Sequence, residues 1–213
     1  MRLNVWKNMI IDYKNKLVFL ATNKTASTSI EATLRKKSYC GYVVGHPSLK
    51  HIDLNKIKMI QNALNIQDFK VWCVIRHPVD KSISWYNYRS RGQIKTTHRY
   101  LGNKSYEEYL NSMTTYDLNA NNDSKQVFDD RGNQADIVFD FNQRSELLSF
   151  LNHVYGISSL PKLNSSASYG MSYNPSDTER DLASKILKSE IMAFNKIKTN
   201  TFKEAKLTLS KKK

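Results

Sequence analysis

The fold is decided by residues 17–30, LVFLATNKTASTSI, where a short apolar run leads into a loop of small polar residues. Residues 17–22 are almost continuously apolar, which is typical of a strand that is buried on both faces of a parallel sheet. The loop over residues 23–29 holds one lysine and four hydroxyl side chains, and a helical composition follows it. A strand, a loop and a helix in this order indicate an α/β protein.

A second unit of the same kind lies further along the chain. The apolar run Val71–Ile75 predicts another buried strand, and Pro78 stands where the first turn of a helix tolerates proline. Buried strands that alternate with helices predict a P-loop-like parallel β-sheet flanked by helices, in a single domain of the α/β class. The other expected elements are strands over residues 42–44 and 137–141, helices over residues 29–37 and 145–155, and helices that begin after Asp53, Ser105 and Ser176.

Length and charge narrow the class of protein. A chain of 213 residues fits one domain, and 40% hydrophobic residues are enough for a core, which excludes a chain disordered throughout. Residues 1–104 hold 19 Lys and Arg against 5 Asp and Glu, so the net charge of +14 lies in the N-terminal half. This excess predicts an anionic ligand there. We expect a domain over residues 1–200 and a basic, solvated tail over residues 201–213.

Cysteine content and hydropathy argue against several other classes. The two cysteines, Cys40 and Cys73, are too few for a disulfide framework or a four-thiolate zinc site. The longest apolar runs are far shorter than the ~18 residues that span a bilayer. Residues 1–11 lack the cleavage site of a signal peptide. We therefore expect no metal, no transmembrane segment and a cytoplasmic location.

The loop over residues 23–29 has the chemistry of a phosphate site. Backbone N–H groups at the start of a helix are unpaired and attract anions. Lys24 and the hydroxyl groups of the loop would add further donors. The usual nucleotide-binding loop contains Gly-Lys, and this loop has no glycine, so an ordinary ATPase or GTPase is disfavoured. The alternative interpretation is that these residues only cap a helix.

Arg76 follows the second buried strand directly. The carboxyl ends of parallel strands form the edge at which α/β proteins bind ligands, and the planar guanidinium of arginine suits a phosphate. Ser84 follows two turns into the next helix. The alternative is an ion pair between Arg76 and Asp80. Two strand-to-helix loops that both carry phosphate-binding side chains are much less likely to arise by chance than one.

Residues 19–30 and 74–86 together resemble the sulfotransferases that use 3′-phosphoadenosine-5′-phosphosulfate (PAPS), specifically the carbohydrate (family 2-like) branch. The resemblance implies that the first loop holds the 5′-phosphosulfate and that the Arg76 motif, which also includes Pro78 and Lys81, holds the 3′-phosphate. The chain departs from the family pattern at Ser27, where glycine is common, and at His77, where Asp or Asn is usual. The cofactor-binding residues that the resemblance implies are Lys24, Thr25, Ala26, Ser27, Thr28, Ser29, Arg76 and Ser84.

Sulfuryl transfer also needs a base for the acceptor hydroxyl, and histidine is suited to this because its pKa lies near the operating pH. The resemblance favours a histidine that lies between the two cofactor motifs. His51, which directly precedes the helix expected after Asp53, fits this pattern best, and His46 is the rival. His77 and His153 are interpreted as structural. Lys24 is the candidate cation for the charge that develops on the bridging oxygen.

The sequence thus favours a PAPS-dependent enzyme that transfers a sulfuryl group to a hydroxyl of a glycan or another hydroxylated acceptor. A kinase of the P-loop type is one alternative, but the Gly-Lys pair and an evident magnesium carboxylate are missing. A basic nucleic-acid-binding protein is the other, because the isoelectric point is about 9.7. The anionic cofactor explains the same charge, and no helix-turn-helix, zinc-knuckle or RNP motif is visible, so no nucleic-acid partner is expected.

Overall fold

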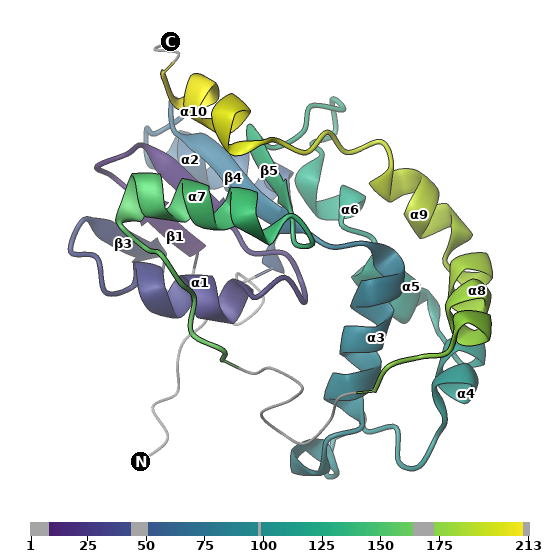
Figure 1. Ribbon diagram of the computed structural model, residues 1–213. Coiled ribbons are helices and arrows are strands. Elements are labelled where there is room, and N and C mark those ends of the chain that lie inside the picture. Colours follow the sequence, from purple (N-terminus) through teal and green to yellow (C-terminus); the bar gives the residue numbers. More distant parts are fainter. Residues whose placement is uncertain (1–8, 44–50, 98, 164–172, 211–213) are drawn as a thin grey trace.

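The chain is described from a computed structural model, over residues 9–43, 51–97, 99–163 and 173–210. Its centre is a five-stranded sheet with the strand order β3-β1-β2-β4-β5 (Figure 1). The strands are β1 (Met9–Asp12), β2 (Leu17–Leu20), β3 (Cys40–Val43), β4 (Lys70–Ile75) and β5 (Ile137–Asp140).

The two strands that lead into the predicted site, β2 and β4, are parallel to each other and to β5. β2 pairs with β4 so that Phe19 lies opposite Trp72, and β4 pairs with β5 so that Val74 lies opposite Phe139. β1 pairs antiparallel with both β2 and β3. The predicted α/β class with a parallel sheet is therefore confirmed for the core, while the whole sheet is mixed.

β1 was not expected from the sequence, and a tight turn accounts for it. The buried carboxylate of Asp12 accepts hydrogen bonds from the backbone N–H groups of Lys14 and Asn15, each at 3.0 Å. Lys16 closes the turn in the left-handed region at a φ of 54°. The turn places β1 antiparallel beside β2, so that residues 9–12 form a strand of the sheet.

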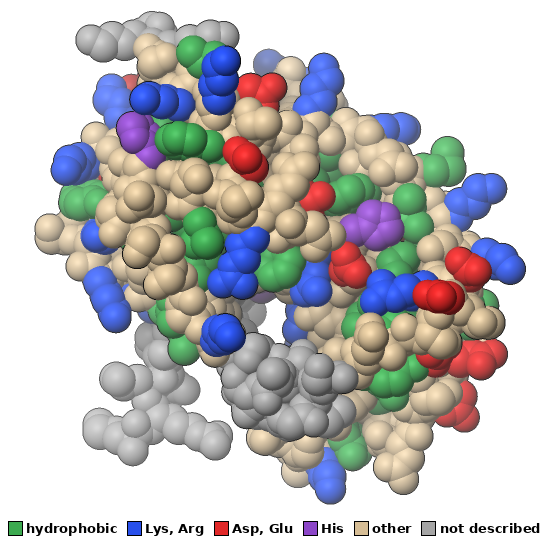
Figure 2. All heavy atoms as spheres, in the orientation of Figure 1, with side chains coloured by type: hydrophobic (Ala, Val, Ile, Leu, Met, Phe, Trp, Pro, Cys, Tyr) green, Lys and Arg blue, Asp and Glu red, His purple; other side chains and the backbone are tan. Residues whose placement is uncertain are grey.

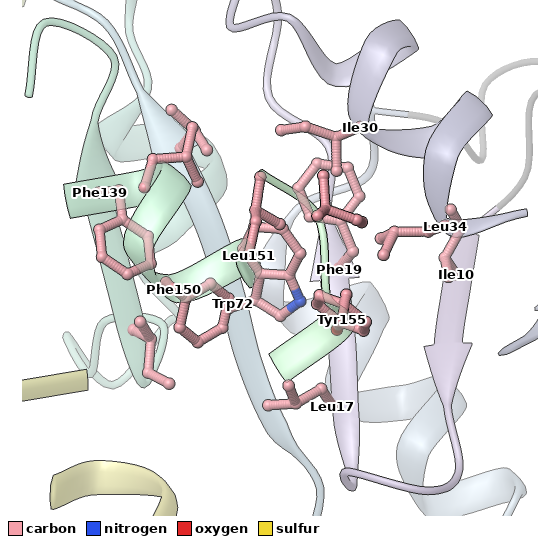
Figure 3. Close-up of a cluster of buried hydrophobic side chains, with 14 of the residues drawn as sticks. Ile10, Leu17, Phe19, Ile30, Leu34, Trp72, Phe139, Phe150, Leu151 and Tyr155 are labelled. Carbon is pink, nitrogen blue, oxygen red and sulfur yellow. The ribbon is translucent and has the colours of Figure 1, made fainter. Parts of the chain in front are cut away.

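Helices cover both faces of the sheet, in which almost every residue is buried. On one face, the Trp72 ring lies between Phe19 and Phe150, with ring centroids 4.5 and 5.2 Å away (Figure 3). The helices of this face are α1 (Ser27–Leu34), α7 (Arg144–Tyr155) and α10 (Phe202–Ser210). The opposite face packs against α2 (Leu54–Ala63), whose N-terminus is capped as predicted by Asp53, which accepts a hydrogen bond from the Lys56 N–H at 2.9 Å.

A second group of helices lies to one side of the sheet (Figure 1). It buries its own cluster of side chains, with Ile83, Tyr106 and Ala183 among them. The predicted capping boxes that begin with Ser105 and Ser176 are both present. The sequence predicted one helix after Ser176, and the structure divides it at Leu187 into two. The helices of this group are α3 (Pro78–Arg89), α4 (Tyr106–Asn111), α5 (Thr115–Asn121), α8 (Asp177–Ile186) and α9 (Lys188–Phe194), with a 3-10 turn, η2, over Gly92–Ile94. The short helix α6 (Ser124–Val127) contributes Val127 to the buried cluster on the α2 face of the sheet instead.

The C-terminal segment differs from the expectation of a solvated tail. Residues 202–210 form α10, which packs on α7, and Ala205 on this helix is completely buried. A solvated segment therefore cannot begin at residue 201, because small and apolar side chains at helical spacing join the core there. The division of the chain at residue 200 stays a prediction.

The carboxyl ends of β2, β4 and β5 meet at one edge of the sheet. From β2 the chain turns toward β3 on one side, and from β4 it turns toward β5 on the other. The gap between the ends of β2 and β4 is thus the switch point at which sheets of this type bind ligands. Within the described ranges, no helix has the length and apolar character needed to cross a membrane.

Candidate active site

The loop after β2 is anchored to the neighbouring strand. The hydroxyl of Thr22 donates a hydrogen bond to the Val74 carbonyl of β4. The hydroxyl of Thr25 lies 3.0 Å from that of Thr22 and donates to the Thr22 carbonyl at 3.1 Å. Both threonines are buried. The Thr25 hydroxyl, which the sequence offered as a phosphate donor, is therefore bonded inside the loop, and it stabilises the backbone that faces the switch point.

Two residues of this loop have a strained backbone. Lys24 and Ala26 adopt the left-handed conformation, with φ of 62° and 60°. This conformation costs an L-residue about 1–2 kcal/mol, and such strain is found mainly at functional sites. Left-handed residues alternating with ordinary ones turn successive N–H groups to one side and create a concave anion site. The loop is thus shaped for an anion although it contains no glycine.

The first turn of α1 continues this surface. The Ala26 carbonyl accepts hydrogen bonds from the N–H groups of Ser29 and Ile30, at 2.9 and 3.1 Å. Within the described residues no side chain caps the start of α1. Ser27 and Ser29 are buried there, and Thr28 is half-buried between them. The predicted phosphosulfate residues therefore form one continuous turn at the positive end of a helix.

Lys24 extends from the loop to the first helix of the second group. Its ammonium nitrogen lies 5.0 Å from the centroid of the Trp85 ring and 4.7 Å from that of Tyr88, both on α3. The pKa of Lys24 is lowered to about 7, mainly by burial and then by the positive charges of Arg91, Arg76 and Lys81, in that order. Aromatic rings stabilise this cation, while its charged neighbours repel it. The sequence placed Lys24 in the loop, but it did not indicate the aromatic contacts.

Arg76 joins the second strand end to the same loop. Its guanidinium donates a hydrogen bond to the Lys24 carbonyl at 3.2 Å and lies 4.7 Å from the centroid of the Phe141 ring. Its Nε is buried with no hydrogen-bond partner in the described part of the chain. Burial lowers the pKa of Arg76, although the charge of Asp80 opposes this. Arg76 is thus a half-buried cation with a buried, unused donor.

The alternative that Arg76 merely pairs with Asp80 is not supported. Asp80 accepts a hydrogen bond from the Asn142 amide at 3.0 Å, and its other oxygen lies 3.6 Å from Arg180. Among the described residues, neither Lys24 nor Arg76 forms an ion pair with a carboxylate. Two neighbouring cations that form no ion pair among the described residues favour the binding of an anion.

The position of Lys81 differs from what the resemblance implied. Its ammonium group is completely buried and lies 2.5 Å from the carboxylate of Asp123, which is also buried. The second oxygen of Asp123 accepts a hydrogen bond from the Arg76 N–H at 3.0 Å. Lys81 is therefore a structural partner of Asp123, and this carboxylate fixes the backbone of Arg76. The role of Asp123 could not be predicted from the sequence, because Asp123 lies 42 residues from Lys81 in a polar stretch with no distinguishing motif.

His51 lies beside the first loop. Its Nδ1 is 2.7 Å from the Ala21 carbonyl at the end of β2. A carbonyl can only accept a hydrogen bond, so Nδ1 carries the proton, and Nε2 is the nitrogen that can accept one when the ring is neutral. The amide of Gln126 donates to the His51 carbonyl at 2.9 Å. His46, the rival base, lies outside the described residues.

The remaining candidate residues lie around this centre. Ser84 is half-buried on α3, one residue before Trp85. The His77 ring meets Phe194 edge-on at 5.4 Å, and the exposed His153 meets Phe202 of α10 in the same way at 5.5 Å, which agrees with the structural interpretation of both. In the described ranges, His, Cys, Asp and Glu form no group of three that could hold a metal ion.

A space-filling view shows the shape of the surface around the two parts of the molecule. The surface is hollowed between the part that contains the sheet and the part that contains α3, and Lys and Arg side chains lie around the hollow (Figure 2). The structure therefore joins two positive strand ends, a strained anion-binding loop and a fixed imidazole at the switch point of the sheet. Such a site can bind a ligand with two anionic groups and accept a proton beside it.

Comparison with known proteins gives one match. The model of the sulfotransferase family matches residues 7–192, which is most of the chain and includes both strand-end loops. No curated protein and no solved structure matches the chain.

Proposed function

Because this chain belongs to the sulfotransferase family, we propose that its strand-end site transfers a sulfuryl group from PAPS to a hydroxyl of a carbohydrate, with His51 as the general base. Membership of the family makes the chain a PAPS-dependent sulfotransferase. One observation carries the assignment of the site: Lys24 and Arg76 meet at the ends of two parallel strands, and among the described residues no carboxylate is paired with either.

The residues present fit the cofactor. The turn from Lys24 to Ser29 would hold the 5′-phosphosulfate, with backbone N–H groups as the main donors. Arg76, whose buried Nε has no partner in the described part of the chain, would hold the 3′-phosphate together with Ser84. When bound, PAPS supplies an activated sulfuryl group on a phosphate leaving group. Charge-assisted hydrogen bonds from arginine and lysine are the interactions that this ligand requires.

Lys24 is assigned to the charge that develops on the leaving phosphate. A fixed cation at this position stabilises the transition state more than the ground state, because negative charge grows as the bond to sulfur breaks. The rings of Trp85 and Tyr88 support this role, since they restrict the long lysine side chain in the free protein. The side chain is therefore held near the loop before the ligand binds.

His51 is assigned to the acceptor hydroxyl. The hydrogen bond from Nδ1 to the Ala21 carbonyl supports this, because it fixes the ring and leaves Nε2 as the basic nitrogen. The position of His51 beside the first loop also supports it. The carbohydrate nature of the acceptor is proposed from the resemblance of both phosphate motifs to the carbohydrate branch. The cytoplasmic location stays a prediction.

The test of this assignment is a pair of histidine variants. Release of 3′-phosphoadenosine-5′-phosphate (PAP) from radiolabelled PAPS would be measured with a mixture of oligosaccharide acceptors. We expect His51→Ala to lower kcat by about 10²–10⁴-fold, the range for loss of a general base. The Kd for PAP should stay within about twofold, because His51 is assigned to neither phosphate. His153→Ala is the matched control, since this exposed histidine lies on α7, and it should leave both quantities unchanged.

Two outcomes would reassign the base. If His51→Ala keeps its rate while His46→Ala loses it, His46 is the base. If neither variant lowers kcat, the base is not a histidine in this segment, although cofactor binding would still identify the donor site.

A further inference from the structure

The short helix α6 is bonded to both halves of the candidate site. Asp123, at its N-terminus, accepts a hydrogen bond from the Arg76 N–H at 3.0 Å. Three residues later, the side-chain amide of Gln126 donates a hydrogen bond to the His51 carbonyl at 2.9 Å. One turn of helix therefore contacts the main chain of the arginine assigned to the cofactor and the main chain of the proposed base.

Hydrogen bonds fix this turn at both ends. The Asp123 carbonyl accepts hydrogen bonds from the N–H groups of Gln126 and Val127, at 2.9 and 3.0 Å. The carboxylate of the same residue is paired with the buried ammonium group of Lys81. At the other end of α6, the Val127 carbonyl accepts a hydrogen bond from the Ala135 N–H at 2.8 Å. A displacement of α6 would therefore disturb both of its hydrogen bonds to the site.

Apolar packing holds the same three segments together. Ile52, Ile75 and Val127 belong to one buried cluster, on the face of the sheet that packs against α2. Each of them is next in sequence to one of the three residues concerned: the proposed base, the arginine assigned to the cofactor, and the glutamine. A close-packed cluster resists small changes in the positions of its members. The cluster and α6 together therefore set the spacing between the base and the arginine.

The reaction is sensitive to where the His51 ring lies. The hydrogen bond from Nδ1 to the Ala21 carbonyl fixes the rotation of the ring, but the position of the ring also depends on the main chain that carries it. The half-buried side chain of Gln126 bonds to that main chain. A proton acceptor must lie within hydrogen-bond reach of the reacting hydroxyl, and a displacement of about 1 Å can lower a rate by about 10²-fold.

We propose that Gln126 is a positioning residue, which holds the main chain of His51 so that Nε2 meets the acceptor hydroxyl, and that α6 sets this position relative to Arg76. The inference rests on the proposed function, because it requires His51 to be the base. It gives Gln126 no contact with PAPS, so the affinity for the cofactor should not depend on this side chain. A hydrogen bond with a purely structural role would contribute to stability and leave the rate of transfer unchanged.

The first test is Gln126→Met, which keeps the length of the side chain and removes the donor. With saturating PAPS and the mixture of oligosaccharide acceptors, kcat should fall about 10–100-fold, and the Kd for PAP should stay within about twofold. Gln126→Glu, whose carboxylate cannot donate, should behave alike and serves if the first variant folds poorly. The matched control is Gln134→Met, because the half-buried Gln134 donates to the Lys198 carbonyl at 2.7 Å, outside the site. It should keep its kcat.

A double variant shows whether Gln126 acts through His51. His51→Ala/Gln126→Met should be no slower than His51→Ala, because a positioning residue has no effect once the group that it positions is gone. A further fall by the same factor as in the single variant would show that Gln126 acts by another route. That result, or a normal kcat in Gln126→Met, would overturn the proposal.

NMR of the ¹⁵N-labelled full chain separates this inference from the proposed function. The ring signals of His51 are assigned by their absence in His51→Ala. In the wild type and in Gln134→Met, the neutral ring should carry its proton on Nδ1, whereas Gln126→Met should give signals averaged between the two tautomers. If the ring signals are unchanged in Gln126→Met while His51→Ala lowers kcat, the base is supported and the positioning role is wrong. If His51→Ala keeps its full rate, the proposed base is wrong, and averaged ring signals in Gln126→Met would still show that Gln126 holds His51.

Discussion

Binding of PAP should draw a proton from solution, because Lys24 is not fully charged in the free protein. Its pKa is lowered to about 7, first by burial and then by Arg91, Arg76 and Lys81. At pH 8 the side chain is therefore neutral in about 90% of molecules, since a group one pH unit above its pKa is about ten to one deprotonated. A bound phosphate reverses the local charge, and the pKa of Lys24 must rise.

The size of the effect follows from this shift. If the bound phosphates raise the pKa of Lys24 above about 9, binding at pH 8 takes up about 0.9 proton, and binding at pH 6 takes up about 0.1 through this residue. The affinity for PAP should then fall about tenfold, or about 1.4 kcal/mol, for each pH unit above 7 until the pKa of the bound state is reached. Binding of PAP therefore weakens as the pH rises, because the proton that Lys24 takes up must come from the solution.

Isothermal titration calorimetry at pH 8 measures this directly. The apparent enthalpy is compared between buffers of different ionisation enthalpy, and the slope gives the protons taken up per PAP. The second phosphate pKa is near 6, so the ligand itself contributes little at this pH. Lys24→Arg is the matched control, because its guanidinium stays charged. It should bind PAP with almost no proton uptake. Uptake near zero in the wild type, or equal uptake in Lys24→Arg, would refute the assigned contact between Lys24 and the ligand.

Four further variants test stability, measured by urea unfolding. Lys24→Met should raise the free energy of unfolding by about 2–5 kcal/mol below pH 7, and the gain should shrink as the pH rises toward 10.5, because the lowered pKa means that the folded state loses its proton first. Asp123→Ala should cost about 3–5 kcal/mol by leaving buried Lys81 unpaired. Lys81→Met/Asp123→Leu should recover most of this stability but not the affinity for PAP, since Arg76 still lacks its backbone partner. A double variant that binds PAP normally would show that Asp123 does not position Arg76. Ala26→Gly should stabilise the protein by about 0.5–1 kcal/mol, because glycine tolerates the left-handed backbone; a loss of stability there would argue against strain.

The two strand-end loops were predictable because their signals are local. The apolar runs before Lys24 and Arg76 identify the strands, and the residues that follow each run indicate the candidate site. The capping boxes at Ser105 and Ser176 were also predictable, because each depends on two residues three positions apart. Such features need no knowledge of what packs against them.

The contacts that tune the site were not predictable, because they join distant parts of the chain. Trp85 and Tyr88 lie over Lys24 from a helix that follows a different strand, and no spacing rule connects them. The ion pair between Asp123 and Lys81 was not predictable for the same reason. This pair gives Lys81 a structural role in place of the phosphate-binding role that the resemblance implied. β1 was not predictable because its pairing depends on a turn at Asp12, and its residues alone carry no clear strand pattern.

The most direct test of the account is the affinity of the protein for PAP compared with AMP and ATP in one calorimetric series. PAP can occupy both strand ends, whereas AMP lacks the 3′-phosphate assigned to Arg76 and Ser84. Loss of one charge-assisted hydrogen bond costs about 1.5–3 kcal/mol, so PAP should bind at least about tenfold more tightly than AMP or ATP, and Arg76→Ala should remove the difference. Equal affinity for PAP and AMP, tighter binding of ATP, or an unchanged preference in Arg76→Ala would contradict the two-phosphate site on which the account depends.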